Sequence, residues 1–75
     1  MYNSTIIIKD IDTAREFVNK MARFMDTDVT LHSGDYSIDG HSIIGIISLD
    51  LSKPIEVALG DNASDELINI IKQYA

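Results

Sequence analysis

The stretch His-Ser-Ile-Ile-Gly-Ile-Ile-Ser-Leu-Asp-Leu, residues 41–51, determines how the rest of the chain is interpreted. Ile43, Ile46 and Ile47 follow the i, i+3, i+4 spacing of one helix face, and Ser42 stands where an N-cap belongs. The pattern predicts a short helix that begins at Ser42 and is apolar on nearly every side. Because so short a helix can bury only part of its surface, we expect an exposed apolar patch. Such patches usually mark partner sites.

Length and composition limit the possible protein classes. The chain has 75 residues, 45% of them apolar, and no cysteine, which indicates one domain (residues 1–75) without disulfides or thiolate metal sites. A net charge of -6 argues against nucleic-acid binding, which needs a basic surface. No apolar run reaches the roughly 18 residues of a membrane span, and the start of the chain does not resemble a signal peptide. A cytoplasmic protein that neither spans nor binds a membrane is expected.

Two further helices are predicted on either side of this stretch. Thr13-Ala14-Arg15-Glu16 has the pattern of a capping box, and apolar residues at helical spacing follow to about residue 25. Met21 and Met25 belong to that apolar set, so we interpret them as core residues and not as ligands. The last helix is expected over residues 64–74, with acidic residues at its start and a lysine near its end.

Strands are predicted over residues 5–9, 28–33, 36–38 and 55–59, with residues 1–4 as an extension of the first. Gly34-Asp35 is typical of a hairpin turn, and Pro54 ends the central helix. The order β-α-β-β-α-β-α, with mostly alternating strands, predicts an α+β fold. We expect an open-faced sandwich with a four-stranded antiparallel sheet and three helices on one face.

Ser-Ile-Ile-Gly-Ile-Ile-Ser-Leu, residues 42–49, resembles the regulatory-serine segment of HPr, the small phosphocarrier of the bacterial sugar phosphotransferase system. Asp28-Val29-Thr30-Leu31 is similar to the second strand of that family, and the likeness extends without a gap to about residue 60. The resemblance implies the HPr-like open-faced sandwich and a role connected with the phosphotransferase system.

The chain departs from that family at the phosphocarrier motif. Counted back without gaps, Ile11 falls where the family has its phosphorylated histidine, Thr13 replaces the arginine and Ala14 replaces the proline. An isoleucine cannot accept a phosphoryl group, and the carboxylates of Asp10 and Asp12 would repel an incoming phosphate. We therefore expect neither phosphocarrier nor enzymatic activity, and no cofactor.

Two features of residues 41–51 remain as candidate sites. Ser42 matches the serine that HPr kinase/phosphorylase modifies in the family, although a plain N-cap explains a serine there equally well. Ile43, Ile44 and Ile47 correspond to the family's docking surface for enzyme I, the kinase and a transcription regulator. The alternative is core packing, which we expect instead for Ile46 and Leu49.

The two histidines are the other candidates. His41 lies where the family usually has lysine; it could assist anion binding beside Ser42, but an exposed polar residue is the simpler interpretation. His32 is expected on the outer surface of a strand. Two histidines with scattered aspartates lack recognised zinc spacing, so no metal site is expected. Two alternatives stay open: phosphotransfer at His41 or His32, or a structural or oligomerising domain, with the chain a monomer or weak homodimer.

Overall fold

Strands and helices follow one another in the predicted order in the computed structural model, which describes residues 2–75. Residue 1, which belonged to the predicted extension of the first strand, lies outside the described residues. The elements are β1 (Tyr2–Ile6), α1 (Ile11–Met21), η1 (Ala22–Phe24, a 3-10 turn), β2 (Val29–Ser33), β3 (Tyr36–Asp39), α2 (Ile43–Ile47), β4 (Ile55–Leu59) and α3 (Asp65–Lys72).

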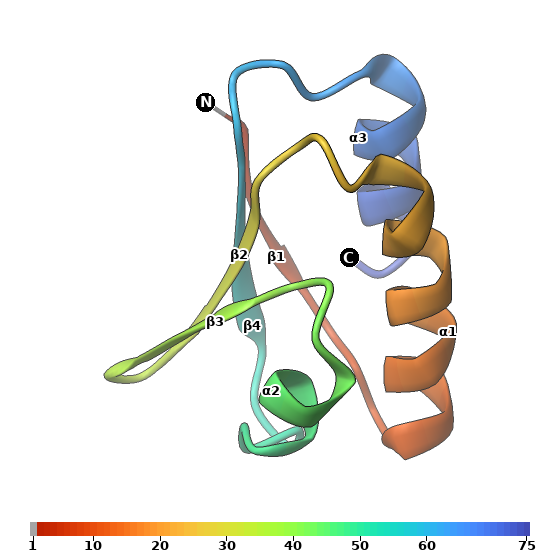
Figure 1. Ribbon diagram of the computed structural model, residues 1–75. Coiled ribbons are helices and arrows are strands. Elements are labelled where there is room, and N and C mark those ends of the chain that lie inside the picture. The colour runs from red at the N-terminus through yellow and green to blue at the C-terminus, as the bar shows by residue number, and fades with distance from the viewer. Residues whose placement is uncertain (1) are drawn as a thin grey trace.

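The four strands form one antiparallel sheet in the order β1-β4-β2-β3. β4 pairs with strands on both sides, so that Val57 lies opposite Ser4 of β1 and Leu31 of β2. The three α-helices lie on one face of this sheet and leave the other uncovered, as Figure 1 shows. The predicted open-faced sandwich is therefore confirmed.

Alternating strands and helical stripes supply the core. β4 buries Ile55, Val57 and Leu59, while Glu56 between them points outward. The helices meet this face of the sheet with apolar side chains of their own, and the largest fully buried ones are Phe17, Met21, Ile46, Leu67 and Ile71. With no disulfide available, close packing of these side chains stabilises the domain.

The first strand lies earlier than predicted, at Tyr2–Ile6 instead of residues 5–9. The backbone leaves the sheet at Ile7, whose amide nitrogen donates to the carbonyl oxygen of Tyr74 at 2.7 Å. Ile8 is nevertheless fully buried. The alternation of buried Ile6 and Ile8 with exposed Ile7 therefore continues beyond the end of the strand, and this pattern alone does not show where strand pairing stops.

The first helix begins two residues before Thr13, and Asp10 is its N-cap. An oxygen of the Asp10 carboxylate accepts from the Thr13 amide at 2.8 Å. The capping-box prediction at Thr13 was thus wrong. Aspartate caps a helix as well as threonine does, and the earlier of the two capping residues was used.

The same helix also ends earlier than predicted, at Met21, and continues as the short 3-10 turn η1. Beyond it the Thr27 amide donates to the Phe24 carbonyl at 3.1 Å, which turns the chain toward β2. Met25 consequently lies outside the helical stripe and is 66% exposed. The prediction that Met25 belongs to the core was wrong, whereas Met21 is buried.

The central helix has the predicted N-cap but is shorter than residues 42–51. Ser42 Oγ accepts from the Gly45 amide at 3.1 Å, and α2 ends at Ile47 after 5 residues. Ser48 Oγ donates to the Gly45 carbonyl at 2.6 Å, which uses one of the free acceptors at the helix end. α3 begins where predicted, after the cap Ser64, and ends at Lys72.

Candidate functional site

α2 lies beside the start of α1 at one end of the molecule, as Figure 1 shows, and the two helices are in contact. Its other neighbour is β3. A Cβ atom built on Gly45 would lie 3.2 Å from the Cβ of Ile38, which is tighter than ordinary van der Waals contact. The missing side chain at Gly45 therefore lets α2 lie close against the sheet.

The isoleucines of α2 divide between core and solvent. Ile46 and the following Leu49 are buried, as expected, and Ile43 packs partly against the core. Ile44 is 76% exposed and Ile47 is 44% exposed. We call Ile43, Ile44 and Ile47 the α2 surface. Two large apolar side chains exposed on one helix are typical of a surface that binds a partner.

The neighbouring start of α1 is apolar as well. Ile11 is the first residue of that helix and is 51% exposed. The amide of Thr13, one of the free donors at the helix N-terminus, is taken by the Asp10 carboxylate. Hydrogen bonds from the side chain and main chain of Thr13 lower the pKa of Asp10, so the carboxyl group is an anion at neutral pH. The N-terminus of α1, where the helix dipole favours an anion, therefore already has the Asp10 carboxylate bound to it.

Ser42 is the N-terminal cap of α2. It is partly buried, and its hydroxyl oxygen is engaged by Gly45. The next residues of α2 carry no charge. The hydroxyl of Ser42 thus has a structural role in the unmodified protein, which any modification would have to preserve or replace.

The structure corrects the interpretation of His41 as an exposed polar residue, since its side chain is only 10% exposed. Nδ1 lies 2.7 Å from an Asp39 carboxylate oxygen, and Nε2 lies 3.1 Å from the main-chain oxygen of Phe24. The Asp39 oxygen also accepts from the His41 amide at 2.9 Å. These bonds lower the pKa of Asp39, with the main-chain donor as the largest cause. Both ring nitrogens are occupied, which argues against His41 as a phosphoryl acceptor.

His32 lies elsewhere, on the uncovered face of the sheet, where it was expected. Its Nδ1 is 2.7 Å from the hydroxyl of Ser37 on the neighbouring strand, and Glu56 is its cross-strand partner on the other side. The helices pack on the opposite face (Figure 1). His32 is thus separated from Ser42 and the α2 surface by the thickness of the sheet.

Solved structures with the same arrangement of strands and helices are known. The structure described as HPr-C-His from Thermoanaerobacter tengcongensis superposes with a TM-score of 0.76 at 23% sequence identity, covering 97% of this chain and 93% of that one. A histidine-containing phosphocarrier protein from Mycoplasma gives a TM-score of 0.77 at 19% identity, covering 96% and 89%. This chain has the HPr fold. No protein-family model and no curated protein sequence matches it.

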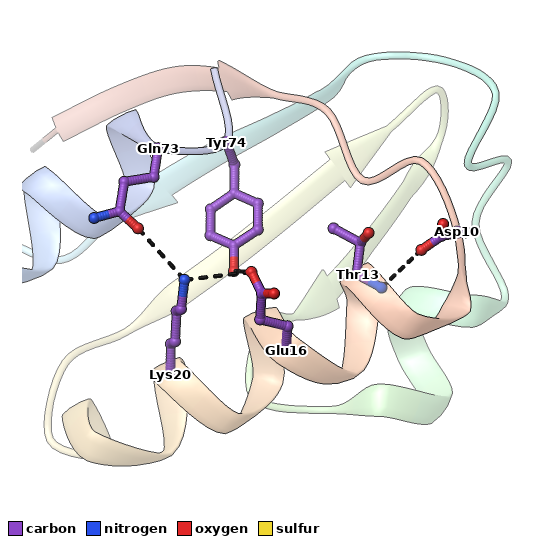
Figure 2. A network of polar contacts seen from close by, with 6 residues as sticks. All are labelled: Asp10, Thr13, Glu16, Lys20, Gln73 and Tyr74. Carbon is purple, nitrogen blue, oxygen red and sulfur yellow. Dashed lines mark hydrogen bonds and ion pairs between the residues drawn. The ribbon is translucent and has the colours of Figure 1, made fainter.

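Within this HPr fold, one polar cluster was not predicted. Figure 2 shows Tyr74 meeting α1, where its hydroxyl donates to Glu16 at 2.8 Å and Lys20 reaches both Glu16 and Gln73. The Tyr74 ring packs edge-to-face on Phe17, with centroids 5.1 Å apart. The hydroxyl is the largest cause of a lowered pKa at Glu16, and burial raises the pKa of Tyr74.

This cluster fastens the end of the HPr fold to its first helix. The i, i+4 pairing of Glu16 with Lys20 can be read from sequence, but Tyr74 is 58 positions from Glu16 and cannot.

Residues 2–75 contain no group of three or more histidine, cysteine, aspartate or glutamate side chains placed to hold a metal ion. None of the helices in that range is long and apolar enough to cross a membrane.

Proposed function

We propose that this chain is a regulatory or interaction module with the HPr fold that binds a protein partner through the α2 surface. The observation that carries the proposal is the exposure of Ile44 and Ile47 on α2, together with that of Ile11 on α1, the helix that α2 contacts. A phosphocarrier needs a nucleophile and a free anion site at the start of α1. Here that position offers an apolar side chain and a carboxylate, which suit an apolar contact and not a phosphoryl group.

The resemblance supplies the candidate partners. They are enzyme I, HPr kinase/phosphorylase and a transcription regulator, all of the phosphotransferase system, and a cytoplasmic location goes with them. Ser42 is the proposed regulatory phosphorylation site. Neither enzymatic activity nor a cofactor is part of the proposal.

Binding is tested by titrating the 15N-labelled chain with purified enzyme I, or with HPr kinase/phosphorylase, from a Gram-positive bacterium. We expect amide shifts confined to α2 and the start of α1. Ile44→Asp should weaken binding by about tenfold or more, since it places a charge in an apolar contact. Met25→Asp is the matched control, because Met25 is equally apolar and exposed but lies outside α2. Equal weakening by both variants would contradict the proposal.

Phosphorylation is tested on the same protein by intact mass. Incubation with enzyme I and phosphoenolpyruvate should add no acid-labile phosphate, because the start of α1 offers no acceptor. Incubation with ATP and the kinase should add a single phosphate that Ser42→Ala abolishes. An acid-labile phosphate would instead support transfer at a histidine and would be traced with His32→Gln.

Self-association is the other use of the same surface. Sedimentation of the chain alone across a range of concentrations distinguishes self-association from binding to another protein. A monomer that binds a partner supports the interaction module. A dimer that Ile44→Asp dissociates supports an oligomerising domain instead.

A further inference from the structure

His41 occupies the junction between two parts of the fold. It immediately precedes the cap of α2, and its ring reaches the main chain at the end of η1, where the first helical segment stops. Its Nε2 lies 3.1 Å from the main-chain oxygen of Phe24, which connects this junction to η1. The ring is mostly buried, so its two nitrogens depend on these protein partners.

Both partners of the ring are hydrogen-bond acceptors. The carboxylate oxygen of Asp39 accepts hydrogen bonds, and so does the carbonyl oxygen of Phe24; neither can donate. The two contacts are therefore both hydrogen bonds only when both nitrogens of His41 donate. A neutral imidazole has a single N–H, so only the imidazolium satisfies the two contacts at once.

The charges around the ring agree with a cation. Asp39 and Asp28 line the same open cavity of about 340 Å³ as His41. Arg23 on η1 is engaged elsewhere, at 2.6 Å from Glu66, and Asp26 in the following loop is exposed. The ring thus contacts the carboxylate of Asp39 on β3, while the nearby cation Arg23 is paired with Glu66.

We propose that His41 is a proton-dependent clasp that fastens the start of α2 to the end of η1. When the ring loses a proton, it keeps one donor. That donor stays on the shorter, charge-assisted contact with Asp39, and the bare Nε2 then faces the Phe24 carbonyl, lone pair against lone pair. The bond to η1 is lost and α2 is held less firmly. An effect of this change on partner binding rests on the proposed function, whereas the clasp itself does not depend on that function.

The clasp is tested on the chain alone, without a partner. The 15N shifts of the His41 ring should show two protonated nitrogens at about pH 5.5 and one at about pH 8.5. Over the same interval the protection factor of the Gly45 amide should fall by about tenfold, the loss of one hydrogen bond to a charged group.

The Leu67 amide is the internal control, because it donates to Ser64 Oγ at the start of α3 in the way that Gly45 donates to Ser42 Oγ. Its protection factor should not change between the two pH values.

Two variants complete the test. His41→Gln should remove the pH dependence at Gly45, and His32→Gln should preserve it, since His32 bonds Ser37 on the other face of the sheet. If His41→Gln does not fold, the 15N shifts of the His41 ring in the unaltered chain still test the proposal. A His41 ring with one bare nitrogen at about pH 5.5, or equal Gly45 protection at both pH values, would overturn the proposal. Loss of partner binding in Ile44→Asp bears only on the proposed function, so the two can fail separately.

Discussion

α2 and α3 contain similar residue types, but their apolar side chains lie in different environments. Both are rich in isoleucine, and each has a serine cap whose hydroxyl accepts from the amide three residues on. α3 runs for 8 residues and buries one stripe: Leu67, Ile70 and Ile71. α2 runs for 5 residues, buries only Ile46, and leaves Ile44 and Ile47 in solvent. The difference teaches that an exposed apolar helix follows from length and placement, not from composition.

Truncation of one isoleucine in each helix gives the largest expected difference. Ile71→Ala removes a fully buried side chain and should lower the free energy of unfolding by about 2–5 kcal/mol. Ile44→Ala removes a side chain that is already in water and should change it by less than about 0.5 kcal/mol. Urea denaturation measures both. A comparable loss in the two variants would mean that Ile44 contributes to packing, and the α2 surface would lose its basis.

Removal of the caps is the next test of the comparison. Ser42→Ala and Ser64→Ala should each cost about 1 kcal/mol, because each leaves one helix amide without its acceptor. Amide exchange should place the first loss at Gly45 and the second at Leu67.

Ser42→Asp and Ser64→Asp are the matched controls, since aspartate also caps helices and should retain most of the stability. An unchanged Gly45 amide in Ser42→Ala would show that the hydroxyl of Ser42 is not a structural cap.

Acid should distinguish the helices by a smaller effect. Asp10 caps α1 and Asp39 holds the His41 amide before α2, and the pKa of each carboxyl is lowered below 3.8 in the folded protein. The unfolded chain then binds more protons at low pH. The stability that they contribute is present above about pH 4–5 and is lost as the pH falls through the folded pKa values.

The amides of Thr13 and His41 report this loss directly. Both should lose protection below about pH 4, while the Leu67 amide, whose cap is a serine, should respond only to global unfolding. Asp39→Asn should flatten the profile at His41 and leave that at Thr13 unchanged. A pH-independent Thr13 amide would contradict the role given to Asp10.

Much of the fold could be predicted because periodicity and caps are local signals. β4 alternates as expected, Ser42 and Ser64 are the caps of the last two helices, and the element order is the one read from the sequence. The errors lie at boundaries where two local signals competed. Asp10 and Thr13 can both cap a helix, and Ile8 is still buried beyond the end of β1, so the sequence pattern alone could not place these two boundaries.

The candidate site was predicted less completely. The sequence placed the apolar run, and the resemblance to HPr suggested Ile44 as a surface residue and Ile46 as a core residue, whereas the helical spacing alone put the buried Ile46 and the exposed Ile47 on one face. The environment of His41 could not be predicted from the sequence, because one of the two partners of its ring is the main-chain oxygen of Phe24, 17 positions away. Every residue has a main-chain carbonyl oxygen, so the pattern of side chains along the sequence cannot predict which carbonyl accepts this hydrogen bond.

By itself, the sequence determined the order of the elements, the faces that each buries and the absence of a histidine at the start of the first helix, since periodicity, capping and residue identity are properties of neighbours along the chain. The tertiary structure alone decided that α2 stops at Ile47, that Ile11 stands exposed at the start of the helix that α2 contacts, and that the ring of His41 is held between two acceptors. Those outcomes depend on which distant segments meet, and only packing brings them together.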